Sequence, residues 1–139
     1  MPILDFVYGD VVHARHKVVV LLAHIDPRQN EGWSAGVLLQ LLNNMGGVQE
    51  PGSHKKYVWE KRTYYVLFCR DDKDGWMKMP GYLRDLLAGI RFVKHRIIAV
   101  EEMNVEFHPV DDVVYYEMMH VLGHTKHHIH VIIPQPRGS

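Results

Sequence analysis

Val18-Val19-Val20-Leu21-Leu22-Ala23 is a run of aliphatic residues without a polar position, and a polar loop of residues 24–31 follows it. Such a run is typical of a strand that is covered on both faces of a sheet. The loop leads into Gly32-Trp33-Ser34-Ala35-Gly36 and then into the helix-like run of residues 37–45. Small residues at a helix entrance let backbone N–H groups approach an anion, but they also cap helices without a ligand. A phosphate site is therefore one hypothesis for this loop, and simple helix capping is the other.

Length and composition restrict the class of protein. The chain has 139 residues, 47% of them apolar, which suits one domain with one core. It has 16 basic and 16 acidic residues, so no overall charge attracts nucleic acid or an anionic membrane. The single cysteine, Cys69, excludes an intrachain disulfide, and 18 apolar residues never run together. We expect a soluble intracellular protein, cytoplasmic or nuclear, with no membrane partner.

Strand-like and helix-like segments alternate along the chain. The expected strands are residues 4–12, 18–23, 96–100 and 129–133, together with a hairpin over residues 56–69 that turns at residues 60–62. The expected helices are residues 33–45, 80–93 and 113–122, and a polar loop is expected over residues 70–79. Strands that alternate with helices of about 10–15 residues predict a largely parallel sheet between helical layers.

Four patches resemble one known family in their order and spacing. The sequence Phe6-Val7-Tyr8-Gly9-Asp10 resembles that family's first strand, which ends in Gly-Asp, and Ala23-His24 with Ser34-Ala35-Gly36-Val37 resembles its second strand and helix entrance. The other two patches are Gly46-Gly47-Val48-Gln49-Glu50 and Arg62-Thr63-Tyr64-Tyr65-Val66-Leu67. The family is the macrodomains, in particular the branch of the terminal ADP-ribose protein glycohydrolase. The resemblance implies a three-layer α/β/α macrodomain with a mixed, largely parallel central sheet over residues 1–136, and residues 137–139 are expected to be an added tail.

The resemblance also implies a cleft for ADP-ribose or an ADP-ribosylated macromolecule, without a cofactor. In the family, an aspartate after the first strand accepts a hydrogen bond from the adenine amino group, and Asp10 matches it. Backbone N–H groups at the helix entrance cradle the diphosphate. The ligand-binding residues implied for this chain are Asp10, Val11, His24, Trp33, Ser34, Ala35, Gly36, Val37, Arg70, Met103 and Asn104.

Two loops depart from the family pattern. The second phosphate loop, residues 99–106, has no glycine and carries Glu101 and Glu102 where phosphate oxygens would lie. Like unit charges about 4 Å apart repel by roughly 4 kcal/mol at an effective dielectric near 20. In the first loop, Pro27 lacks an N–H donor. These departures favour an alternative function, in which a degenerate macrodomain serves as an interaction module for protein or nucleic acid without hydrolase activity.

The residues that would carry catalysis are also altered. In that branch a lysine attacks the anomeric carbon of the ribose, and an acidic residue assists. Arg70 stands at the position of the lysine, and arginine stays protonated, so it is not an amine nucleophile. Lys73 or Lys78 is the candidate displaced into this role, although solvated loop lysines are the simpler interpretation. Glu106 matches the assisting acid with one added methylene. The sequence suggests a binding module or an altered ADP-ribosyl hydrolase.

Histidines and aromatic residues outside these patches have simpler interpretations. Five of the 11 histidines fall in residues 120–130, but only His128 and His130 share one face of a strand, so no metal site is expected. We expect an exposed sheet edge there, with His124 capping the helix end. Trp33 and Trp76 fall in loops predicted at the edge of the cleft.

A basic and aromatic patch covers the predicted hairpin. Its members are Lys55, Lys56, Tyr57, Trp59, Lys61 and Arg62. Such a patch suits single-stranded nucleic acid, but a net charge of zero favours a solvated hairpin. Nucleic acid is thus a partner that the sequence allows and does not favour.

Overall fold

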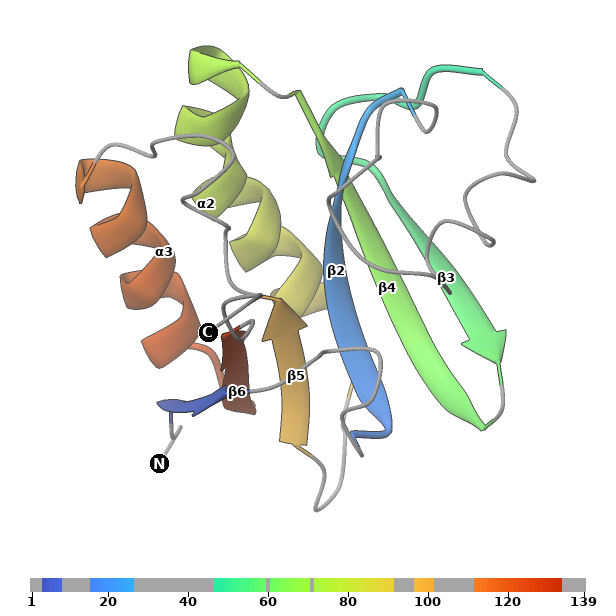
Figure 1. The fold of residues 1–139 in the computed structure, drawn as a ribbon, viewed down its shortest axis with the longest axis vertical. Coiled ribbons are helices and arrows are strands. Elements are labelled where there is room, and N and C mark those ends of the chain that lie inside the picture. Colours follow the sequence, from blue (N-terminus) through green and yellow to red (C-terminus); the bar gives the residue numbers. More distant parts are fainter. Residues whose placement is uncertain are drawn as a thin grey trace, which may run out of the picture.

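A computed structural model describes residues 4–8, 16–26, 47–59, 61–70, 72–91, 97–101 and 112–133. Within these ranges six strands form one sheet in the order β1-β6-β5-β2-β4-β3 (Figure 1). The strands are β1 (Leu4–Tyr8), β2 (Val18–His24), β3 (His54–Trp59), β4 (Arg62–Cys69), β5 (Ile97–Glu101) and β6 (His128–Ile133). The pair β3–β4 is antiparallel and all other neighbouring pairs are parallel. The prediction of a mixed, largely parallel sheet is therefore confirmed.

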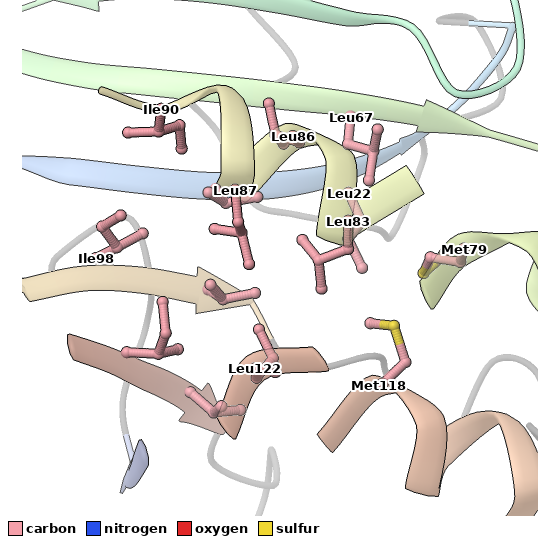
Figure 2. Close-up of a cluster of buried hydrophobic side chains, with 14 of the residues drawn as sticks. Leu22, Leu67, Met79, Leu83, Leu86, Leu87, Ile90, Ile98, Met118 and Leu122 are labelled. Atoms are coloured by element: carbon pink, nitrogen blue, oxygen red, sulfur yellow. The ribbon is translucent and has the colours of Figure 1, made fainter. Parts of the chain in front are cut away.

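Two described helices, α2 (Lys73–Gly89) and α3 (Asp112–Gly123), cover one face of the sheet (Figure 1). Met79, Leu83 and Leu87 of α2 are almost fully buried, as are Met118 and Leu122 of α3. They form one cluster with strand residues such as Leu22, Leu67 and Ile98 (Figure 2). Burying one such side chain is worth about 1.5–3 kcal/mol, so this cluster is a main source of stability.

The opposite face of the sheet is buried as well. Its cluster comprises Val19, Leu21, Ala23, Tyr64, Val66, Phe68 and Ala99, each at most 3% exposed. Successive side chains of a strand point to opposite faces, so β2 buries both sets of its residues. This explains why residues 18–23 contain no polar position. The helix predicted over residues 33–45 lies outside the described residues.

Helix α2 begins earlier than the sequence predicted. Residues 70–79 were expected to be a loop and Pro80 the first turn of a helix, but Pro80 lies buried inside α2. Asp72 is the N-cap, and its Oδ1 accepts a hydrogen bond from the Gly75 backbone N–H at 2.8 Å. A proline inside a helix costs about 3 kcal/mol, which the cap and the buried residues on both sides of Pro80 offset. Trp76, expected in a loop, therefore lies in α2 and packs against the core.

The C-terminal histidine tract also differs in part from the prediction. Strand β6 pairs with β1 on one side and with β5 on the other, so the exposed sheet edge expected there is wrong. The expected cap is confirmed, because His124 Nδ1 lies 2.8 Å from the His120 carbonyl oxygen. In the part of the chain that the structure describes, no helix is long and apolar enough to cross a membrane.

Candidate functional site

The carboxyl ends of β2 and β4 meet in the interior of the sheet. His24 of β2 is the register partner of Cys69 of β4, and the Ile25 N–H continues the pairing with a hydrogen bond to the Cys69 carbonyl at 3.1 Å. Ligands of parallel α/β sheets bind beyond the carboxyl ends of the strands. We call the end of the sheet at which β2 and β4 finish the carboxyl edge, and we treat it as the candidate site.

A backbone hydrogen bond defines the tautomer of the neutral His24 ring. The backbone N–H of Asp26 donates to His24 Nδ1 at 2.9 Å, and the ring is half-buried. An imidazole that accepts at Nδ1 carries its proton at Nε2 when it is neutral. The neutral ring therefore acts as a hydrogen-bond donor through Nε2.

The segment before β3 also reaches the carboxyl edge. The Gln49 N–H donates to the Ile25 carbonyl at 2.7 Å, and the Gly52 N–H donates to the Phe68 carbonyl at 2.7 Å. Gly52 has a φ of 83°, and a Cβ there would lie 2.7 Å from the Tyr82 ring. Any other residue here would be strained, because the backbone angle is positive and a side chain would crowd the Tyr82 ring. Residues 47–50, part of the third family-like sequence patch, lie beside the end of β2 through the hydrogen bond of Gln49 to Ile25.

Arg70 follows β4 directly and is anchored by the start of α2. Its Nη2 lies 2.8 Å from Asp72 Oδ2, while Oδ1 of the same carboxylate caps the helix through Gly75. The Gly75 backbone packs so closely on Arg70 that a Cβ there would lie 1.9 Å from the Arg70 carbonyl oxygen. One carboxylate thus joins the end of β4, the guanidinium and the first turn of α2.

The described part of the chain contains three of the predicted site residues. His24 ends β2, Arg70 follows β4, and Lys73 is the exposed first residue of α2 instead of a loop residue. The other predicted residues lie outside the described ranges: Asp10, Val11, Trp33, Ser34, Ala35, Gly36, Val37, Met103, Asn104 and Glu106. Their roles stay predictions.

Two structural residues of this site were missed by the sequence analysis. Asp72 and Gly75 hold the junction between β4 and α2, and both were assigned to a polar loop. The signal was present, because Asp72 precedes a helical stretch with Asp74 in its first turn. Acidic residues at a helix start satisfy backbone N–H groups and favour the positive end of the helix dipole.

Among the residues described, no group of three or more His, Cys, Asp or Glu side chains is arranged to hold a metal ion. The polar side chains described at the carboxyl edge include the imidazole of His24, the guanidinium of Arg70 and the carboxylates of Asp26 and Asp72.

Comparison with known proteins identifies the fold. No protein-family model matches the sequence, and no curated protein matches it. Among solved structures, the macrodomain of Thermus aquaticus DarG matches with a TM-score of 0.63 and 16% identity, over 98% of this chain and all of that chain. An alphavirus P23pro-zbd structure matches with a TM-score of 0.69 and 10% identity, over 96% of this chain but only 22% of that one. The chain has the macrodomain fold, as the four sequence patches predicted.

Proposed function

We propose that this macrodomain binds ADP-ribose, free or attached to a macromolecule, at the carboxyl edge of β2 and β4. The observation that carries the proposal is that His24 ends β2 and Arg70 follows the neighbouring strand β4, in a chain that matches a macrodomain along 98% of its length. The step from fold to ligand is an analogy, because one fold can host many functions. The chemistry of the two side chains supplies an independent argument.

Arg70 is suited to an oxygen-rich anion. A guanidinium has five N–H donors in a planar fork that matches phosphate and carboxylate oxygens. The ion pair with Asp72 engages Nη2 and fixes the orientation of the group at the end of β4. Fixing a donor before the ligand arrives lowers the entropy cost of binding. His24 adds an N–H group at Nε2 at the end of the neighbouring strand, because its Nδ1 accepts from the Asp26 backbone.

We expect the protein to remove ADP-ribose from modified macromolecules slowly or not at all. The position that the resemblance gives to a nucleophilic lysine is taken by Arg70, which does not lose its proton near neutral pH. Lys73 and Glu106 remain the residues that would carry any residual removal of ADP-ribose from modified protein or nucleic acid. Binding is thus the main activity, and turnover is secondary.

Isothermal titration calorimetry with ADP-ribose tests the proposal. Replacing Arg70 with alanine should weaken binding about 10- to 100-fold, since a hydrogen bond to a charged group contributes roughly 1.5–3 kcal/mol. The matched control is Arg84→Ala on α2, whose side chain is 70% exposed and pairs only loosely with Asp85 at 3.6 Å. Arg84→Ala should bind as the wild type does.

The calorimetry also separates the proposal from its alternative. If the folded wild type takes up no ADP-ribose at millimolar concentration, the ligand proposal is wrong. The missing glycines of residues 99–106 would then favour the degenerate interaction module. Folding must be checked on the same sample by near-ultraviolet circular dichroism.

A further inference from the structure

A pair of histidines joins two strands that are not neighbours in the sheet. His16 precedes β2 by two residues, His130 lies in β6, and β5 lies between those strands. His16 Nε2 lies 3.0 Å from His130 Nδ1, and the two rings meet edge to face with centroids 5.1 Å apart. The register partner of His130 on β5 is Ala99, which belongs to the buried face opposite α2 and α3. The pair therefore fastens the start of β2 to β6 across that face.

Only one proton can lie between His16 Nε2 and His130 Nδ1. One ring must donate its N–H and the other must accept with a lone pair, because two N–H groups 3.0 Å apart would repel. The other nitrogen of His16, Nδ1, is buried, and among the described residues it has no hydrogen-bond partner. A protonated His16 would carry an N–H there without an acceptor, which is costly for a buried donor. Both nitrogens of His16 therefore favour the neutral ring.

The surroundings of the pair also favour the neutral form of His16. Burial lowers the pKa of His16 below its ordinary value, and the nearby charges of His130 and Arg62 lower it further. The His128 ring lies edge to face against His130 with centroids 5.0 Å apart. Lys17 is the sequence neighbour of His16, and Asp5 of β1 is the register partner of His130. The charged groups that lower the pKa of His16 are thus His130 and Arg62, and His128 contacts only the partner ring of His130 in this description.

We propose that His16 and His130 form a proton-controlled latch, which holds the start of β2 against β6 while one N–H lies between the rings and opens when both rings are protonated. The latch is independent of ADP-ribose, since it lies at the start of β2 and the carboxyl edge lies at its end. It would make the attachment of His16 to β6 depend on pH in the mildly acidic range, where imidazoles titrate.

Nuclear magnetic resonance of the histidine side chains tests the latch. At about pH 7.5, long-range ¹H–¹⁵N spectra should show both rings neutral, with one nitrogen of the contact protonated and the other bare. Nuclear Overhauser effects between the two rings should be present at that pH and lost once acidification has protonated both rings. Wild-type protein suffices for these measurements, so they hold even where a variant does not fold. Two rings that keep their contact while both are protonated would overturn the proposal.

A variant then tests whether the two titrations are coupled. His130→Asn places an amide near the position of Nδ1, so the hydrogen bond can persist without a second titrating ring. The titration midpoint of His16 should move upward toward that of an ordinary histidine. His54→Gln is the control, because His54 lies exposed on β3, and it should leave the His16 titration unchanged. An unshifted His16 midpoint in folded His130→Asn would show that the rings titrate independently and would overturn the latch.

Discussion

The buried imidazole of His127 donates from Nε2 to the Ile90 carbonyl oxygen, 3.1 Å away, and lies 3.3 Å from the Leu87 carbonyl oxygen. A carbonyl only accepts, so this contact fixes the proton of His127 on Nε2. Leu87 belongs to the last turn of α2, where carbonyl groups lack helical partners. The residue that precedes β6 therefore caps the end of α2 and ties the two elements together.

Replacing His127 with alanine should destabilise the protein by about 2–4 kcal/mol. The estimate combines a buried carbonyl pair that loses its donor with the cavity that the ring leaves. His127→Gln keeps an N–H donor at a similar reach and should cost clearly less. Urea unfolding followed by circular dichroism measures both changes. Equal losses for alanine and glutamine would mean that the ring packs but does not cap.

Gly75→Ala should disrupt the junction between β4 and α2. A Cβ at this position would lie 1.9 Å from the Arg70 carbonyl oxygen, so backbone must move. We expect a loss of stability of about 2–4 kcal/mol, in the range of overpacked or strained sites. Gly89→Ala is the matched control, because nothing lies within 4 Å of a Cβ there. The control should be neutral or stabilise α2 by up to about 1 kcal/mol, since alanine is the better helix former.

Asp72→Ala separates the two roles of this carboxylate. Loss of an N-cap costs about 1 kcal/mol, whereas an exposed ion pair adds little to stability. The melting temperature should therefore fall modestly, while ADP-ribose binding should weaken because Arg70 loses its anchor. Asp72→Ser keeps a cap and removes the ion pair, so it should restore stability without restoring affinity. Full affinity in both variants would show that Arg70 does not need Asp72.

The fold could be predicted from local patterns, but the neighbours of each element could not. The run at residues 18–23 predicted a strand buried on both faces, and β2 has that form. In contrast, β6 was expected at an edge, because strand order depends on crossovers that leave no local signal. Pro80 is typical of a helix start, but α2 begins after the cap at Asp72. Local sequence rules do not decide between a cap at Asp72 and a first turn at Pro80, because packing of the residues on both sides of the proline makes the difference.

The sequence could specify only some features of the candidate site, for a related reason. Alignment with the family pattern assigned His24 and Arg70, which lie at the ends of the paired strands β2 and β4. The dual role of Asp72 depends on two contacts made by one carboxylate, and no spacing rule specifies that. The His16–His130 contact joins residues 114 positions apart, so sequence alone gives no reason to pair them.

The folding stability of the protein should rise with pH through the range in which His16 titrates. The pKa of His16 is lowered in the folded state by burial, then by His130 and Arg62. Between the lowered folded value and the ordinary value of about 6.5, the unfolded chain binds more protons than the folded one. The stabilising contribution is therefore complete above the unfolded pKa and is lost as the pH falls toward the folded pKa. Urea midpoints measured from about pH 7.5 to pH 5 should decline more in the wild type than in His16→Gln.

Arg70→Lys should raise the rate of ADP-ribose release from a modified glutamate substrate. The change keeps the positive charge that would bind the anion and introduces an amine, which becomes a nucleophile when it loses its proton. The wild type should turn over slowly or not at all, and Arg84→Lys on the exposed face of α2 should match it. Released ADP-ribose can be followed by chromatography under single-turnover conditions. Rapid hydrolysis by the wild type that disappears in Lys73→Ala would reverse the assignment, because Lys73 at the start of α2 would then be the nucleophile.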